Sequence, residues 1–260
     1  MATFYSPATR PTKLKLVVGS CFLVMFFLAT AAEIPAAKFL ARAQTEFART
    51  QKVFLADTNN VTNCWQFARA CFEVAELATN ETQRATVAKE GIAASRTALA
   101  HAAKSGAAHY YLAMNYGELA SAEAPSLAAY KLVHQIEEEF KTAAELDEKF
   151  DHAGPVRNLG QLYFQAPGWP LSVGSKHKAR EWLERAVTLA PDYPENQIFL
   201  AEAYIKWRQR AEAEKVMQKI EVLWGTLATN FPGETWEKSR TEWATERAKL
   251  IAGFQKAFKN

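Results

Sequence analysis

The sequence predicts an all-α protein built as an array of helical hairpins. Glycine (11) and proline (10) are scarce among 260 residues, which argues against a β protein with many tight turns. Alanine is abundant and runs of β-branched residues are few, which favours helix. Small and large apolar residues also recur at helical steps in consecutive segments between residues 153 and 220. With 49% hydrophobic residues, the chain can bury a core and is not a disordered protein.

The N-terminal segment, residues 1–32, is typical of an export signal. Residues 16–32 carry no charge, three basic residues precede them, and small residues end the segment just before Glu33. A secretory signal peptide has this layout, with cleavage after Ala31 or Ala32. The alternative is an uncleaved membrane anchor, since seventeen residues lie at the short limit for spanning a bilayer. Either interpretation places the body outside the cytoplasm, in the periplasm or extracytoplasmic space, and confines membrane contact to this segment.

Two consecutive units between residues 153 and 220 share one internal spacing. In each, a leucine, a small residue and a tyrosine are followed by a second set that begins with alanine. The third unit has Leu159, Gly160 and Tyr163, then Ala179, Leu183 and Ala186; the fourth has Leu200, Ala201 and Tyr204, then Ala213, Met217 and Ile220. A small residue lets two antiparallel helices approach closely, and larger residues three or four positions away fill the flanking space. This spacing resembles that of the tetratricopeptide repeat, a helical hairpin of thirty-four residues.

Weaker versions of the same pattern extend in both directions. Upstream, residues 112–116 with 136–143 predict a second hairpin, and residues 65–72 with 94–98 predict a first one. At the other end, Phe231, Pro232 and Gly233 interrupt the pattern before a charged helix from Glu234 to Phe258. Such a polar helix would cover the last apolar face of the array. We therefore expect four hairpins with flanking helices in one domain, residues 36–258.

An apolar insert near residues 165–174 interrupts the third hairpin. It carries two prolines around a Gly-Trp pair, so Trp169 is presented on a stiff turn. In one interpretation Trp169 plugs the top of the hairpin. In the other, the loop folds over the concave face and Trp169 walls a ligand pocket, because loops of this length in compact arrays are often functional.

The register of the repeats assigns residues to the concave groove. Positions on the first helix of each hairpin predict groove residues Tyr110, Tyr111, Met114, Arg157, Gln161 and Phe164, with Ile198, Phe199 and Glu202 in the fourth unit. Trp169 of the insert completes the predicted ligand-binding set. This groove is expected to be mostly aromatic and apolar, which suits a small organic ligand or an amphipathic peptide. The guanidinium of Arg157 would either hold a ligand carboxylate or pair with a nearby acid such as Glu118 or Glu202.

Several classes of function are not supported by the sequence. Outside the N-terminal segment the formal net charge is zero, so we expect no nucleic-acid-binding surface. Cys64 and Cys71 lie seven residues apart in a predicted helix, too far to form a disulfide, and we expect two apolar-facing thiols. The five histidines show no metal-ligand spacing, and no catalytic motif or cofactor signature occurs, so we expect no enzyme, metal or cofactor. The acidic run Glu137–Glu139 is interpreted as a solvated helix face.

One stretch resembles a known family. Residues 154–163, then Ala166-Pro167-Gly168-Trp169-Pro170, then residues 172–176 are similar to the T component associated with tripartite ATP-independent periplasmic (TRAP) transporters. The resemblance extends over about residues 55–225. It implies an all-α, non-enzymatic protein of the export compartment, an oligomer (a trimer), and contact with the substrate-binding P subunit, a solute-binding protein. It also implies a cleft for a hydrophobic or carboxylate-bearing ligand. The family is often lipid-anchored, whereas this N-terminus lacks a convincing lipidation cysteine.

Two functional hypotheses follow. The first is an accessory component of a TRAP-type uptake system that binds or passes a small organic molecule. The second is a tetratricopeptide scaffold for protein–protein interaction in the cell envelope, with another envelope protein as its partner.

Overall fold

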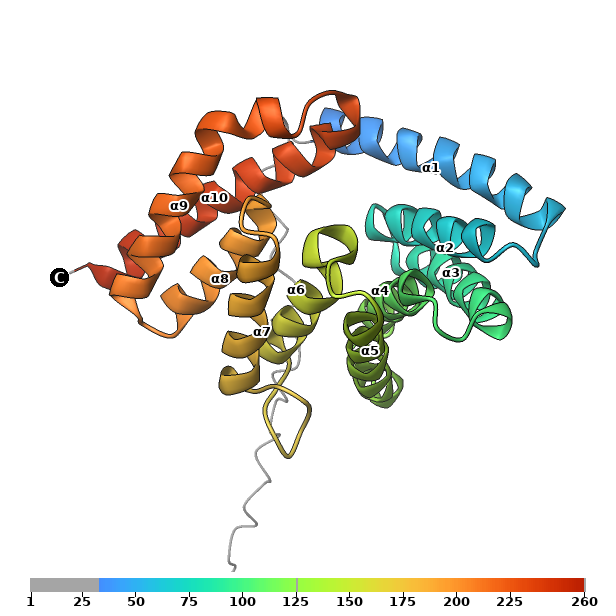
Figure 1. Ribbon diagram of the computed structural model, residues 1–260, viewed down its shortest axis with the longest axis horizontal. Coiled ribbons are helices and arrows are strands. Elements are labelled where there is room, and N and C mark those ends of the chain that lie inside the picture. Colours follow the sequence, from blue (N-terminus) through green and yellow to red (C-terminus); the bar gives the residue numbers. More distant parts are fainter. Residues whose placement is uncertain (1–32, 125, 260) are drawn as a thin grey trace, which may run out of the picture.

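The structure, a computed structural model, describes residues 33–124 and 126–259 and consists there of α-helices joined by short loops (Figure 1). The helices are α1 (Glu33–Ala56), α2 (Val61–Glu76), α3 (Glu81–His101), α4 (Gly106–Ala122), α5 (Leu127–Leu146), α6 (Phe150–Gln165), α7 (Lys176–Leu189), α8 (Pro194–Lys206), α9 (Arg210–Asn230) and α10 (Glu237–Phe258), with a 3₁₀ turn η1 (Glu234–Trp236) before the last. The predicted all-α hairpin array is confirmed. No helix within these residues is long and apolar enough to cross a membrane. The signal-or-anchor prediction for residues 1–32 concerns a segment outside the described residues.

Polar side chains set where most of the hairpin helices begin. Asn60 accepts hydrogen bonds from the amides of Thr62 and Asn63 at the start of α2, and Asn80 caps α3 in the same way. Serine caps begin three later helices, α4, α5 and α7. Each cap satisfies an amide that would lack a partner, and contributes roughly 1 kcal/mol.

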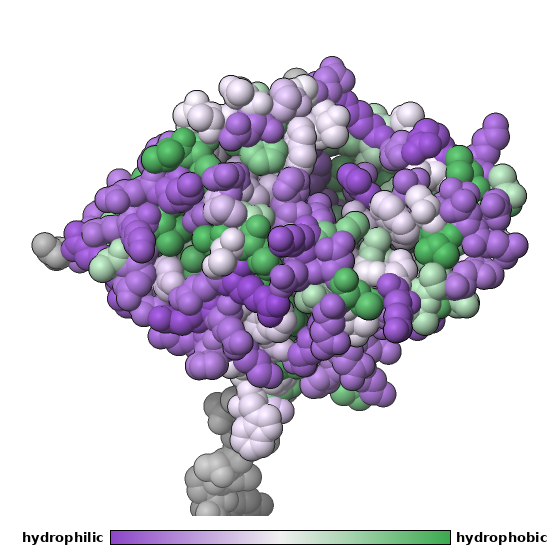
Figure 2. Space-filling view, in the orientation of Figure 1, coloured by the Kyte–Doolittle hydropathy of each residue, from purple (hydrophilic) through white to green (hydrophobic). Residues whose placement is uncertain are grey.

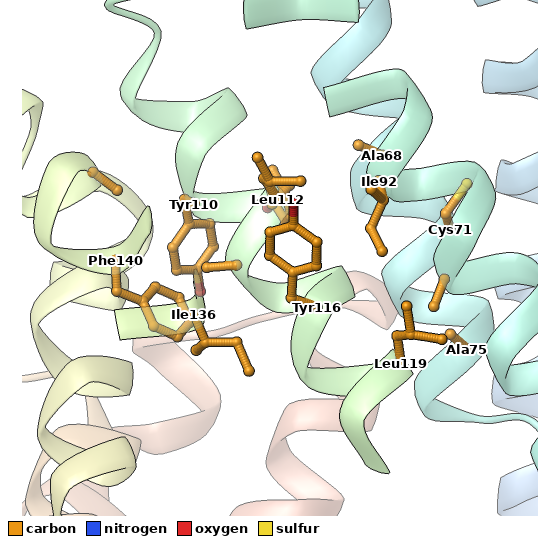
Figure 3. Close-up of a cluster of buried hydrophobic side chains, with 14 of the residues drawn as sticks. Ala68, Cys71, Ala75, Ile92, Tyr110, Leu112, Tyr116, Leu119, Ile136 and Phe140 are labelled. Atoms are coloured by element: carbon orange, nitrogen blue, oxygen red, sulfur yellow. The ribbon is translucent and has the colours of Figure 1, made fainter. Parts of the chain in front are cut away.

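The predicted packing residues lie between the paired helices. Helices α2 and α3, α4 and α5, α6 and α7, and α8 and α9 form the four hairpins. The two spacing sets of the third unit are buried, and in the fourth unit only Met217 remains partly exposed. An N-terminal core runs through α2–α6, where side chains from four helices interlock (Figure 3), and a C-terminal core runs through α7–α10.

Helix α10 completes the C-terminal core. The sequence predicts one charged helix from Glu234 to Phe258; the structure has η1 and then α10 across the same residues. Trp243 and Leu250 are its buried residues, and the helix packs chiefly on α8. Trp243 meets Tyr193 and Phe231 edge-on, with ring centroids 5.3 and 5.1 Å apart.

Two sequence predictions about single residues have opposite outcomes. Cys64 and Cys71 are both buried free thiols, as predicted. Glu137 is not a solvated residue: it is buried, and its carboxylate accepts hydrogen bonds from the Tyr163 hydroxyl and the Lys141 ammonium, both at 2.6 Å. The helix face that carries Glu137 is covered by α6, which the acidic run alone did not indicate.

The third hairpin depends on a glycine. A Cβ built on Gly160 would lie 2.8 Å from Cγ and 3.0 Å from the backbone nitrogen of Leu183, so α6 and α7 touch at backbone distance. Gly225, in α9, has nothing within 4 Å of the same position.

Gly160→Ala should therefore destabilise the protein by about 1–3 kcal/mol, because the added methyl group forces the two helices apart. The matched substitution Gly225→Ala should instead stabilise it by about 0.5–1 kcal/mol, since alanine is the better helix former. Thermal and denaturant unfolding of the two variants measure the difference. Equal effects would contradict the close approach of α6 and α7.

Candidate functional site

The concave side of the array contains a cavity of about 690 Å³. Its wall is formed by residues from α1, α2, α4, α6, α8, η1 and α10, so both ends of the array contribute. Figure 2 shows this face of the molecule, where hydrophilic side chains surround a recess beside α1. The charged lining residues are Arg42, Arg49, Arg69, Arg157 and Lys238 against Glu46, Glu73, Glu76, Asp151, Glu195, Glu234 and Glu242.

Asp151 and Arg157 line the part of the cavity that we call its floor, and Asp151 begins a left-handed turn. Asp151, His152 and Ala153 have φ values of 50°, 56° and 65°, and none of them is glycine. The left-handed region costs L-residues about 1–2 kcal/mol each, so three in a row persist only where the surroundings hold them. His152 stacks flat on Tyr193, with ring centroids 4.4 Å apart.

Arg157 supplies much of that support. The residue is 3% exposed, and its Nη1 donates to the carbonyl oxygens of Asp151 (3.3 Å) and His152 (3.2 Å). The same nitrogen donates to Oδ1 of Asn196 (3.3 Å), whose own Nδ2 donates to the His152 carbonyl at 3.1 Å. Arg157 thus joins the turn to α8.

The charge of Arg157 is neutralised within the protein. Its Nε lies 3.1 Å from Glu195 and Nη2 lies 3.5 Å from Asp151. Burial alone would lower the pKa of Arg157, but Glu195 and its other acidic neighbours raise it. Burial raises the pKa of Glu195, although Arg157 acts in the opposite direction. Arg157 therefore forms ion pairs within the protein, as one of its two interpretations expected. Its partners are Asp151 and Glu195, and not Glu118 or Glu202.

Aromatic rings form two walls of the cavity. On one side Trp65 stacks on Tyr111, with centroids 5.9 Å apart and planes 2° from parallel. Next to them the Tyr110 hydroxyl donates to Asp151 at 2.8 Å and accepts from Asn158 at 3.1 Å. Burial raises the pKa of Tyr110 well above its usual value, so this hydroxyl stays protonated.

The opposite wall is built by residues from the far end of the chain. Tyr193 and Trp236 both line the cavity, with ring centroids 6.4 Å apart. The prediction of a mostly aromatic and apolar groove is therefore only half right: the aromatic residues are present, but charges of both signs stand between them. The repeat spacing predicts lining residues only on the first helices of the hairpins. Many of the charged lining residues lie instead on α1, η1 and α10, which are outside the hairpins.

Ion pairs join the two ends of the array next to the cavity. Glu237 accepts from Lys38 and Arg42 of α1, each at 2.7 Å, and Arg42 also lies 3.0 Å from Glu234. Lys238 lies 2.9 Å from Glu76 of α2. We call these four pairs the clasp. Hydrogen bonds from Lys38 and then Arg42 lower the pKa of Glu237.

The structure brings together four of the seven predicted ligand-binding residues. Tyr110, Tyr111, Met114 and Arg157 line the cavity. Gln161 and Phe164 lie outside it: Gln161 is buried beside Gln165, and Phe164 meets Trp207 edge-on at 5.9 Å. The fourth-unit positions Ile198, Phe199 and Glu202 are also outside it.

Trp169 fits neither of its two interpretations. It is 89% exposed and far from plugging the hairpin, and it does not line the cavity. The loop folds back on itself: the amide of Gly174 donates to Pro167 at 2.9 Å, and the amide of Ser175 donates to Tyr163 at 2.9 Å. These bonds direct the tip away from the concave face.

Lining residues that the sequence did not predict include Asp151 of the turn and residues of α1, α2, η1 and α10. Aspartate and histidine tolerate left-handed backbone better than most residues, but this is a weak signal. Within the described residues, no group of three His, Cys, Asp or Glu side chains is placed to hold a metal ion.

The clasp generates the first prediction for this site. Glu237→Lys should accelerate hydrogen exchange throughout α1, because it places like charges opposite Lys38 and Arg42. Glu246→Lys is the control, since Glu246 pairs with Lys249 of its own helix. Adding Lys38→Glu to Glu237→Lys re-forms one ion pair with reversed charges, while Arg42 keeps Glu234, and should slow the exchange again. Unchanged protection of α1 in Glu237→Lys would show that other contacts hold the ends together.

The second prediction concerns Arg157. Arg157→Gln should destabilise the protein by about 1–3 kcal/mol, because it leaves the partly buried carboxylate of Glu195 without its counter-charge. The loss should be greater at pH 8 than at pH 5: a carboxyl whose folded-state pKa is raised opposes folding once the unfolded chain is ionised. Melting temperatures at both pH values measure this. Arg49→Gln, which removes an exposed partner of Glu46 within α1, should melt like the parent. A pH-independent loss would rule out Glu195 as its cause.

Comparisons with known proteins support the fold. Residues 37–154 match the family model described as "Regulator of microtubule dynamics protein 1-3", which spans less than half of the chain. No curated protein matches the chain. Among solved structures, the chain is similar to TTC0263, a tetratricopeptide protein of Thermus thermophilus, at 14% identity and a TM-score of 0.60, covering 84% of this chain and 96% of that one.

A second similar structure is MamA, with 16% identity and a TM-score of 0.51, covering 78% of this chain and 99% of MamA. At these identities the similarity concerns the fold. The described part of the chain therefore has a tetratricopeptide-like fold, an all-α array of helical hairpins.

Proposed function

We propose that the protein is a non-enzymatic scaffold that binds a polypeptide segment of a partner protein in the central cavity. The observation that carries the proposal is the composition of the cavity wall. Aromatic faces from α2, α4 and η1 stand next to charges of both signs, at the concave surface where both ends of the array meet. Extended concave surfaces of this kind are the binding surfaces of helical-repeat proteins.

The state of Arg157 favours a polypeptide over a small carboxylate ligand. Its guanidinium donors are directed at Asp151, His152 and Asn196, and its charge is balanced by Glu195. A ligand carboxylate would have to displace one of these partners. Arg157 is therefore best described as a residue that positions the floor of the cavity.

Other cations of the wall are more available. Arg49 and Arg69 have half-exposed side chains, and each forms its ion pair with an acid on its own helix. Exposed pairs of this type contribute little to stability, so they exchange partners readily. A polypeptide supplies carboxylates, ammonium groups and apolar side chains together, which matches this mixed wall better than a single organic acid does.

A cavity-filling variant tests the proposal. Ser239 lines the cavity on α10, and Thr241 is exposed two residues further along the helix, outside the lining. Peptides selected from a random display library on the immobilised protein should bind the parent and Thr241→Trp equally, and lose at least about tenfold in affinity for Ser239→Trp. Failure to select any peptide, or equal binding to both variants, would overturn the proposal.

A finer candidate is an accessory component of a TRAP-type uptake system, supported by the motif resemblance over residues 154–176. This candidate would place the body outside the cytoplasm, as the composition of residues 1–32 also suggests, and would give it a solute-binding P subunit as partner. A cavity of about 690 Å³ is within the range for small-molecule sites. Native mass spectrometry of the purified protein would then show a co-purified organic ligand that is lost in Ser239→Trp.

The family model that matches residues 37–154 suggests a different partner class. Its members are described as regulators of microtubule dynamics, and the match covers α1 to the start of α6, which includes the clasp residues of α1. Co-sedimentation with assembled microtubules would support this class over the transporter one.

A further inference from the structure

The loop between α6 and α7 presents apolar side chains to solvent. Trp169 is 89% exposed and Leu171 is 66% exposed, and Pro170 lies between them. Figure 1 shows the loop projecting beyond the end of its hairpin. Large exposed apolar groups at a protruding tip are unfavourable in water and mark a contact surface.

The tip is held in a defined shape. The amides of Leu171 and Ser172 donate to the carbonyl of Gly168 at 3.0 and 3.3 Å, in addition to the two bonds that close the base of the loop. At that base a Cβ on Gly174 would lie 2.0 Å from the carbonyl oxygen of Ala166. A loop that is ordered before contact loses little conformational entropy on binding.

Basic residues follow the tip in the sequence. Residues 166–175 carry no charge, and the next three residues, Lys176, His177 and Lys178, are all exposed. The ammonium groups of Lys176 and Lys178 lie over the rings of Trp207 (5.4 Å) and Tyr163 (4.9 Å), and that of Lys178 lies 3.8 Å from Glu137. Both lysines are nevertheless exposed, so their long side chains can turn toward a charged surface next to the tip. Tryptophan prefers the interface between hydrocarbon and water, and lysine side chains are attracted to anionic headgroups.

We propose that residues 168–171 insert into the surface of an anionic lipid bilayer, with Lys176 and Lys178 contacting the headgroups. The occupant is a bilayer because these two exposed lysines lie next to an apolar tip, an arrangement that complements an anionic interface. This contact would come in addition to that of the N-terminal segment and is independent of the cavity.

The experiment uses the full chain reconstituted in vesicles whose lipids carry brominated acyl chains, which quench tryptophan at membrane depth. The chain contains seven tryptophans, so Trp169 is isolated by difference. Trp169→Phe should lose about half or more of the quenching seen with the parent protein in vesicles containing phosphatidylserine. Trp224→Phe, which removes a partly buried tryptophan of α9, should retain it.

The contribution of Trp169 should fall about twofold or more in vesicles of phosphatidylcholine alone, because the two lysines then have no anionic partner. Equal quenching of the parent and Trp169→Phe in anionic vesicles would overturn the proposal. The exposed tip would then be a contact surface for a protein partner. A Trp169 contribution that is the same in both vesicle types would also overturn it. Trp169 is solvent-exposed, so superimposable melting curves of parent and variant confirm that the fold is retained.

Discussion

The centre of this array is organised by one buried positive charge. A guanidinium removed from water needs both counter-charges and hydrogen-bond acceptors, or it destabilises the fold by several kcal/mol. Arg157 finds its acceptors in the carbonyls of the left-handed turn 151–152 and its counter-charges in Asp151 and Glu195. The turn, the position of α8 and the floor of the cavity are therefore consequences of the same requirement.

The helical hairpins could be predicted from the sequence because their packing is periodic and local. Leu159, Gly160 and Tyr163 are buried at the positions that the repeat spacing predicts. Gly160 allows the close contact with α7 because it has no side chain. Periodicity reports the face of a helix that meets its hairpin partner. It does not report which residues of that helix meet the next hairpin, and for this reason the prediction for Glu137 was wrong.

The candidate site was less predictable because it is built from distant parts of the chain. The left-handed turn depends on Asn196, more than forty residues away, and no local pattern encodes that contact. The charged residues of the cavity are spread over α1, α2, α6, α8, η1 and α10, and the repeat spacing does not extend to α1, η1 or α10. Composition alone assigned Trp169 to the cavity or to the end of its hairpin, whereas hydrogen bonds within its own loop decide its direction.

The clasp changes how the array is connected. In an open repeat array each unit contacts only its neighbours, and the two terminal units loosen independently. Here α1 and α2 are linked to α10 by Lys38, Arg42 and Glu76, so the array is closed into a ring. The paired residues lie 162 to 199 positions apart in the sequence, so we expect these contacts to form late in folding and to act mainly by slowing unfolding. A closed ring should therefore open more slowly than a linear array that carries the same ion pairs within its units.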